Sequence, residues 1–396
     1  GGDAVNYEKI LCPRVVAMPP SGIRKYFDIL SEMKDAISLS IGEPDFDTPW
    51  HISDAAMAYV RDGGTHYTPN RGAVALRKQI SLYMSARFGL DYDPASQILV
   101  TVGASEGIDL ALRAVLEQGD EVIIPDPSYV SYMPVVNMCG GVAVPLVTRQ
   151  EDEFRMRADA LEATITPKTK AVIFPYPNNP TGGIMPRKDL EEVAAVLRKH
   201  DILVISDEIY SELTYGDESH VSIASIDGMA DRTIVLNGFS KSFAMTGWRI
   251  GYLCGPHELV DQMVKIHQYT MLCAPAMGQA AALEALSSAM QDEYGDIKRM
   301  KTTYDVRRRM LLAGFKSMGL PCFEPKGAFY AFPDISSTGL TSEQFCDEFL
   351  MQEHVACIPG TAFGESGEGF VRISYATATR DIERALVKME RFVNQH

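Results

Sequence analysis

Several features that would mark other classes of protein are missing from this sequence of 396 residues. No apolar run approaches the roughly 18 residues that a membrane-spanning helix needs. No basic segment followed by an apolar one stands at the N-terminus, so we expect neither a membrane protein nor a secretory signal. Positive charge is also scarce, since 37 Lys and Arg residues face 52 Asp and Glu residues, a net charge of −15. Nucleic acids and anionic membranes attract basic surfaces, so neither is an expected partner.

Two ligand-binding signatures are missing as well. The seven cysteines are an odd number and include no C-x-x-C pair. This argues against a disulfide framework or a zinc site and is typical of reduced thiols in the cytoplasm, so we expect a cytoplasmic protein without a metal site. No G-x-G-x-x-G follows a strand-like run, so a nicotinamide-dependent dehydrogenase is not expected.

What the sequence does contain is a series of short apolar runs separated by amphipathic helical stretches. Near-continuous apolar runs of this kind are typical of parallel strands that are buried on both faces. We therefore predict an α/β fold in which a mostly parallel, seven-stranded sheet lies between helices. The predicted strands are 98–102, 121–124, 142–146, 171–174, 203–206, 233–236 and 250–253. Helices are predicted over 106–116, 129–138, 188–199 and 265–288, the last with a break at 274–275.

The C-terminal third follows a different pattern, and the chain is long enough for two domains. A long charged helix is predicted over 292–318. Beyond it, strands near 329–332 and 369–375 alternate with helices near 342–352 and 381–393, which is an α+β pattern. We predict a large domain over residues 48–290. The smaller α+β domain would combine residues 1–47, including an N-terminal arm, with residues 291–396.

The stretch from Asn237 to Arg249, between two predicted strands, carries unusual chemistry. Lys241 lies among small residues, away from any run of charges. A lysine in an apolar, semi-buried setting has a lowered pKa and can attack carbonyl groups. Arg249 offers a permanently charged fork that suits phosphate. The pair suggests a carbonyl cofactor with a phosphate, as in pyridoxal 5′-phosphate. For this stretch alone, a surface lysine and a structural arginine are an equally good interpretation.

Other polar residues follow the ends of neighbouring predicted strands, where ligands bind in open parallel sheets. Residues 103–105, Gly-Ala-Ser, open a helix and resemble a phosphate cradle. Asn179 lies in a proline-rich turn after 171–174. Asp207 ends the next strand, close to Tyr210, and a buried carboxylate there needs a partner such as a cationic ring nitrogen. Each feature alone is equally typical of an ordinary turn or helix cap, but ordinary turns do not predict all of them at successive strand ends.

The chain resembles the class I/II aminotransferases of pyridoxal-phosphate fold type I over nearly its whole length. The resemblance is to the bacterial and archaeal aspartate, aromatic and N-acetyl-diaminopimelate aminotransferases in particular. The matching blocks are Ser40-Ile41-Gly42-Glu43-Pro44-Asp45-Phe46, Tyr67-x-x-Asn70-x-Gly72, Asn179-Pro180-Thr181-Gly182, Ser206-Asp207-Glu208-Ile209-Tyr210, Ser240-Lys241-x-Phe243-x-Met245-x-Gly247-Trp248-Arg249 and Gly369-Phe370-Val371-Arg372-Ile373-Ser374-Tyr375.

The resemblance implies roles around the cofactor ring. Lys241 matches the lysine that forms the internal aldimine and moves the proton at the substrate Cα. Asp207 matches the partner of the pyridinium nitrogen, which keeps the ring an electron sink. Tyr210 and Asn179 match hydrogen-bond donors to the ring oxygen, which favour its anionic form. Tyr129 matches the aromatic residue stacked on the ring.

It also implies residues for the phosphate and the substrate. Ala104, Ser105, Ser240 and Arg249 match the phosphate cup, and Tyr67 would reach the phosphate of the neighbouring subunit in a homodimer with shared active sites. Arg372 matches the arginine that clamps the substrate α-carboxylate, with Gly42 and Asn179 as further substrate contacts. A solvent-facing arginine on an alternating strand is the other interpretation of Arg372.

The implied activity is transfer of the amino group of an L-amino acid to 2-oxoglutarate by a ping-pong route. The donor stays open between aromatic, aspartate- or alanine-like and diaminopimelate-type amino acids. Ser105 stands where some aspartate-using relatives have a lysine, which counts against a strongly acidic preference. One alternative is a pyridoxal-phosphate carbon–sulfur β-lyase. Another is a non-catalytic ligand-sensing relative, against which the acidic charge and the lack of an N-terminal helix-turn-helix extension count.

Overall fold

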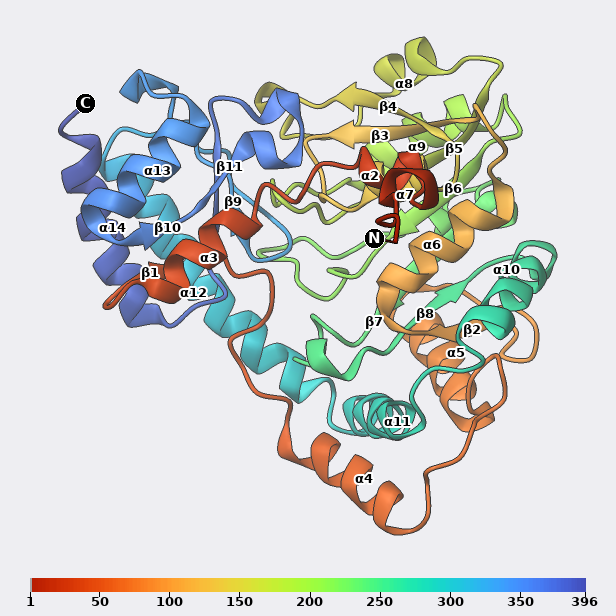
Figure 1. Ribbon diagram of the computed structural model, residues 1–396. Coiled ribbons are helices and arrows are strands. Elements are labelled where there is room, and N and C mark those ends of the chain that lie inside the picture. The colour runs from red at the N-terminus through yellow and green to blue at the C-terminus, as the bar shows by residue number, and fades with distance from the viewer. Residues whose placement is uncertain (1) are drawn as a thin grey trace.

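A seven-stranded sheet is the largest element of the computed structural model, which describes residues 2–396 (Figure 1). Gly1, the first residue of the predicted arm, lies outside the described residues. The strands, in spatial order, are β2 (Ile98–Thr101), β8 (Gly251–Cys254), β7 (Thr233–Gly238), β6 (Leu203–Asp207), β5 (Thr169–Phe174), β3 (Glu121–Asp126) and β4 (Val142–Val147). Only β8 runs antiparallel to its neighbours. The predicted α/β fold with a mostly parallel sheet is confirmed.

Helices cover both faces of this sheet, because successive strand residues point to opposite faces and both sets are apolar. Residues such as Leu99, Ile124 and Ile205 pack under one set of helices, and Val100, Val172 and Val204 pack under the other. The first set is α6 (Gly103–Val115), α7 (Tyr132–Met138) and α10 (His257–Thr270); the second is α5 (Val74–Phe88), α8 (Ala158–Thr164), α9 (Arg187–Leu197) and α11 (Ala276–Gln291), with α4 (Trp50–Arg61) packed on α11.

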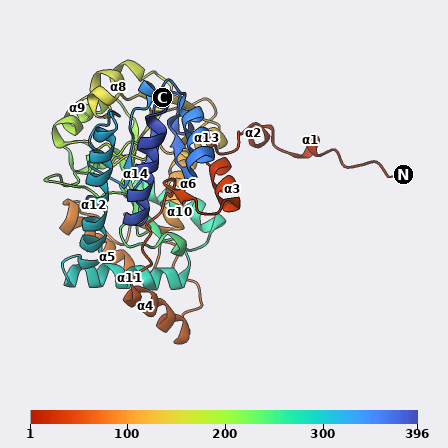
Figure 2. The ribbon, with the colours of Figure 1, turned by 90° about the vertical axis from the view of Figure 1, so that its left-hand side faces the viewer.

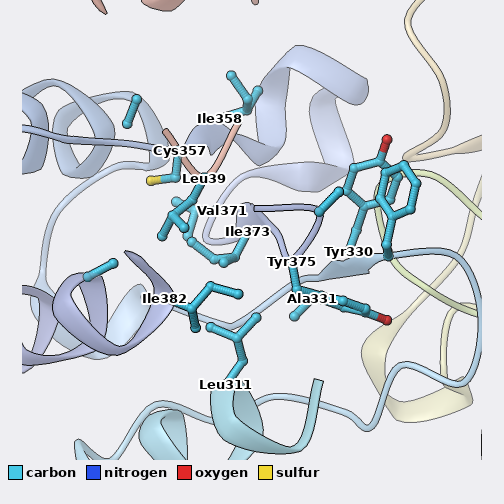
Figure 3. Close-up of a cluster of buried hydrophobic side chains, with 14 of the residues drawn as sticks. Leu39, Leu311, Tyr330, Ala331, Cys357, Ile358, Val371, Ile373, Tyr375 and Ile382 are labelled. Carbon is cyan, nitrogen blue, oxygen red and sulfur yellow. The ribbon is translucent and has the colours of Figure 1, made fainter. Parts of the chain in front are cut away.

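The C-terminal third and an N-terminal segment share a second hydrophobic core, part of which is drawn in Figure 3. Its elements are α3 (Arg24–Glu32), β1 (Ile37–Ser38), α12 (Gly295–Ser317), β9 (Tyr330–Ala331), α13 (Ser342–Glu353), β10 (Val355–Ala356), β11 (Ile358–Pro359), β12 (Val371–Ser374) and α14 (Thr379–Val393). Strand β1 pairs with β10, and β12 lies between β11 and β9. The part of the N-terminal segment between residues 23 and 46 therefore packs with the C-terminal third.

The first residues of the chain extend away from this body and carry two short helices, α1 (Tyr7–Ile10) and α2 (Pro13–Val16) (Figure 2). Most of their side chains are exposed. Among residues 2–396, no helix combines the length and the apolar character that crossing a bilayer requires. The cysteines of the chain are free thiols.

Several helix ends differ from the prediction for local reasons. The helix predicted from residue 106 begins at Gly103, whose φ of +68° lets the chain turn directly from strand into helix. Tyr129 precedes α7, which begins at Tyr132. The predicted break at 274–275 is confirmed, because Pro275 separates α10 from α11. Helix α8 was not predicted, since its seven residues are too few for a periodic pattern.

A close contact between β8 and the start of α6 positions the first turn of that helix. A Cβ added to Gly251 would lie 2.6 Å from the Ala104 nitrogen and 2.7 Å from the Gly103 carbonyl carbon. Both neighbours are backbone atoms of a buried turn, so they cannot move aside cheaply. Only glycine at position 251 allows this approach.

Replacing Gly251 with alanine should therefore push β8 and α6 apart and destabilise the protein by roughly 1–3 kcal/mol, the usual cost of overpacking. The free energy of unfolding in urea measures this effect. Gly247→Ala is the matched control, because a Cβ there meets no atom within 4 Å. Equal stability of the two variants would contradict the expected clash.

Candidate active site

A cavity of about 400 Å³ opens at the carboxyl ends of the parallel strands, between the sheet and the C-terminal third. It brings together all the residues that the sequence predicts for the site except Tyr67. They are Gly42, Ala104, Ser105, Tyr129, Asn179, Asp207, Tyr210, Ser240, Lys241, Arg249 and Arg372. Tyr67 lies on the surface, with 81% of its area exposed.

Lys241 follows β7 and lies in the centre of this group. Its ammonium donates a hydrogen bond to the carbonyl oxygen of Gly42, from the N-terminal segment. Burial lowers the pKa of Lys241 from 10.5 to about 8, and the positive charges of Arg372 and Arg249 act in the same direction. A sizeable fraction of the side chain is therefore an unprotonated amine near neutral pH, which is the nucleophilic form.

Asp207 ends β6 and is buried. The hydroxyl of Tyr132 donates to its Oδ2 at 2.6 Å. Burial raises the pKa of Asp207, although the hydrogen bond from Tyr132 opposes this effect. A cationic group placed in the cavity beside this carboxylate would favour its ionised form.

Arg372 on β12 is a buried guanidinium whose protein partners are neutral. It donates to Asn179 Oδ1 at 3.0 Å and to the carbonyl oxygen of Ser40 at 2.7 Å, while its Nε is buried without a partner. Arg372 is therefore not a solvent-facing residue of an alternating strand, because only 3% of its area is exposed. A buried cation with an unused donor is suited to binding a carboxylate.

The hydrogen bond from Arg372 also orients the side-chain amide of Asn179. Because its Oδ1 accepts from Arg372, its Nδ2 group is left as the donor. Tyr210 stays protonated in the cavity, since burial raises its pKa well above 10. Two neutral donors are thereby available near Lys241.

Arg249 and the start of α6 form a cradle at the other end of the cavity. A Cβ on Gly103 would lie 2.6 Å from Arg249 Nη2, so the guanidinium lies directly against the first turn of the helix. Helix N-termini present free backbone N–H groups and a positive dipole end. Ala104, Ser105 and Ser240 line the same region. Backbone donors, hydroxyls and an arginine together suit a phosphate group.

Comparisons with known proteins agree with this arrangement. A family model described as aminotransferase class I and II matches residues 34–389. The chain belongs to the class I and II aminotransferases. These enzymes use pyridoxal 5′-phosphate, and the protein is accordingly a transferase of amino groups.

Individual aminotransferases resemble the chain over nearly its full length. A putative aminotransferase of Bacillus subtilis is 48% identical, covering 96% of this chain and 97% of the relative. An aspartate aminotransferase of Pyrococcus abyssi is 47% identical, covering 96% and 98%. The crystal structure of an aromatic aminotransferase from Pyrococcus horikoshii is 45% identical and superposes with a TM-score of 0.89, covering 94% and 99%. The β-lyase and the ligand sensor gain no support from these matches.

The residues of this aminotransferase fit the cofactor that the family implies. The cradle at Gly103 and Arg249 suits its phosphate, the buried Asp207 suits a ring nitrogen that carries a proton, and the amine of Lys241 suits its aldehyde. The Asp207 carboxylate and the Arg249 guanidinium lie at different strand ends, so each can meet a different part of the cofactor.

Among the cavity residues that the sequence-based predictions missed are two tyrosines that contact predicted site residues. Tyr132 holds Asp207, and Tyr330 on β9 contacts Tyr210. Tyr132 stands three residues after Tyr129, so the helix predicted over 129–138 already placed both on one face, and this spacing could have identified Tyr132. Tyr330 belongs to a two-residue strand, which is too short to show an alternating pattern.

The lowered pKa of Lys241 has a measurable consequence in protein freed of cofactor. Only the unprotonated amine attacks an aldehyde, so the rate of pyridoxal phosphate capture should rise with pH through a midpoint of about 8 and then level off. Stopped-flow absorbance of the lysine-bound cofactor measures this rate. Lys241→Ala is the control and should show no such band. A midpoint near the ordinary lysine value of 10.5 would show that Lys241 is not buried as described.

Proposed function

We propose that this aminotransferase transfers the amino group of an L-amino acid to 2-oxoglutarate in a ping-pong reaction, with the cofactor bound covalently to Lys241. The observation that carries the proposal is that one cavity holds both a nucleophilic lysine, Lys241, and a buried arginine, Arg372, whose Nε has no partner and could bind a carboxylate. Amino acids and oxo acids both have an α-carboxylate, so one clamp serves both. They must then use the site in turn, so the first oxo acid leaves before the second binds while the enzyme keeps the amino group, as in a ping-pong route.

Bound pyridoxal phosphate would supply an electron sink for the charge that develops at the substrate Cα. In this proposal Asp207 holds the proton on the ring nitrogen, and Tyr132 keeps that carboxylate in place. Tyr210 and Asn179 would donate to the ring oxygen, and Tyr129 would pack on the ring. The amine of Lys241 would carry a proton to and from the substrate Cα.

We propose that the substrate carboxylate and the cofactor phosphate bind at opposite ends of the cavity. Arg372 binds the α-carboxylate, with the Asn179 side chain and the Gly42 backbone beside it. Ala104, Ser105, Ser240 and Arg249 bind the phosphate. The donor amino acid stays open among aromatic, aspartate- or alanine-like and diaminopimelate-type compounds, because relatives of nearly equal similarity carry aspartate and aromatic names.

We further propose a homodimer in which Tyr67 completes the partner's phosphate site. Its support is an apolar surface that a lone chain would leave in water. Tyr67 and Tyr269 are 81% and 87% exposed, and the Asn70 side chain donates to the Leu272 carbonyl at 2.8 Å, which brings their two segments side by side. Exposed apolar patches of this kind mark association sites. The division into domains at residues 48 and 290 and the cytoplasmic location belong to the same proposal.

Half-reactions test the activity directly. Each candidate amino acid, mixed with the holoenzyme without an acceptor, should convert the lysine-bound absorbance band to that of the aminated cofactor, and 2-oxoglutarate should restore it. Lys241→Ala should lose both the band and turnover, because no other amine replaces the nucleophile. Steady release of ammonia from a sulfur amino acid without an oxo acid would instead support a lyase.

Shared sites can be tested by mixing two inactive variants, Tyr67→Ala and Lys241→Ala. After unfolding and refolding together, random pairing gives heterodimers with one intact site each, so about a quarter of the wild-type activity should return. Assays of the mixture against each variant alone measure the recovery. No recovery, with dimers present by light scattering, would mean that Tyr67 serves its own subunit or none.

A further inference from the structure

Tyr330 enters the cavity from β9, on the side opposite the strand ends of the large sheet, and the proposed function does not use it. The residue is fully buried at the edge of the apolar cluster around β9 and β12 (Figure 3). Pairing of Ser374 with Tyr330 fixes its backbone. Its side chain leaves the aliphatic core and reaches Tyr210, Arg372 and Gly42.

Two contacts define the position of this side chain. The Tyr330 hydroxyl oxygen lies 3.0 Å from the Tyr210 hydroxyl oxygen, and the guanidinium carbon of Arg372 lies 4.3 Å from the centre of the Tyr330 ring. The first is a hydrogen bond. The second is close enough for a cation–π interaction, which is strongest where both groups are removed from water. Tyr330 therefore contacts two of the residues to which the proposed function assigns roles.

The direction of the hydrogen bond follows from counting hydrogens. A phenol has one hydrogen to donate. Burial raises the pKa of both tyrosines, so both keep that hydrogen. If Tyr210 donates to the ring oxygen of the cofactor, its only hydrogen is committed. The hydrogen between the two oxygens must then come from Tyr330.

The charged and titratable groups around Tyr330 do not replace it as the donor to the Tyr210 hydroxyl. Arg372 on β12 is engaged with Asn179 and Ser40, and Lys241 after β7 is engaged with Gly42. Tyr129, before α7, is the remaining titratable group that acts on Tyr330. Within residues 2–396, each of the two hydroxyls has the other as its hydrogen-bond partner.

We propose that Tyr330 is a positioning residue for transamination: its hydroxyl donates to Tyr210 and directs the Tyr210 hydrogen to the cofactor ring oxygen, while its ring supports Arg372. The inference rests on the proposed function. A hydroxyl that accepts one hydrogen bond donates the next one more strongly, by about 10–30%. Tyr330 would thus stabilise the anionic ring oxygen through Tyr210.

The test is a spectroscopic pH titration of the lysine-bound cofactor in the holoenzyme. The ring oxygen carries most charge after the imine loses its proton, so a stronger donor lowers the midpoint. Tyr330→Phe keeps the ring and removes only the hydroxyl. It should raise the midpoint by on the order of half a pH unit. Tyr210→Phe should raise it further, and adding Tyr330→Phe to Tyr210→Phe should change nothing more.

The role of the ring is separated from that of the hydroxyl by kinetics. Tyr330→Phe should leave the KM for the donor amino acid unchanged, whereas Tyr330→Leu should raise it severalfold, because Arg372 loses the nearer of its two aromatic neighbours and keeps only Phe363. Tyr252→Phe is the matched control. It removes an equally buried hydroxyl on β8, 3.5 Å from the Met84 sulfur of α5, and should leave both the titration and the KM as in the wild type.

The outcomes are distinct. An unchanged midpoint in Tyr330→Phe, with a raised midpoint in Tyr210→Phe, overturns this inference and leaves the proposed function intact. The inference is also overturned if Tyr330→Phe raises the midpoint as much in the Tyr210→Phe variant as in the wild type, because Tyr330 would then act independently of Tyr210. Absence of a lysine-bound band in the wild-type holoenzyme overturns the proposed function, and this inference with it.

Discussion

Arg372 is a guanidinium buried without a carboxylate, and much of the site is arranged around that constraint. Moving a charge out of water is unfavourable unless it is paired, and here the partners are an amide oxygen, a peptide carbonyl and two aromatic rings. Burial lowers the pKa of Arg372, which reflects the same unfavourable environment. An anion that enters the cavity offsets this cost. An acidic chain of net charge −15 can therefore bind anionic ligands, because Lys241, Arg249 and Arg372 line its cavity.

The N-terminal segment connects this cation to the lysine. Two carbonyl groups of its matching block, two residues apart, accept hydrogen bonds from these cations: Ser40 from Arg372 and Gly42 from Lys241. The segment is held on one side by the pairing of β1 with β10. On the other side Arg307 of α12 donates to both carboxylate oxygens of Asp45 at 2.9 Å. A displacement of this segment would move the hydrogen-bond acceptors of Lys241 and Arg372 together. Because the second core holds the segment in place, it also keeps both cations in position at the end of the sheet.

Much of the fold and of the site could be predicted because the signals are local. Runs such as 171–174 and 233–236 are apolar and lie in the sheet centre, where burial on both faces leaves no alternation to confuse the pattern. Asp207, Lys241 and Asn179 each follow such a strand, so the parallel topology alone brings them to one edge. Helix ends were less predictable. The start of α6 depends on the left-handed backbone of Gly103 against Arg249, a contact between segments far apart in the chain.

The sequence by itself determined the class of sheet, the order of its strands along the chain and the residue types at their ends. Only the tertiary structure decided which of those side chains meet. Tyr210 and Tyr330 are 120 positions apart, and Asn179 and Arg372 are 193 apart. Strand periodicity and turn chemistry depend on neighbours in the chain, whereas hydrogen-bond partners depend on which distant segments pack against the same space. That packing turned a set of plausible strand-end residues into a cavity with an unpaired cation, a nucleophilic amine and two linked phenols.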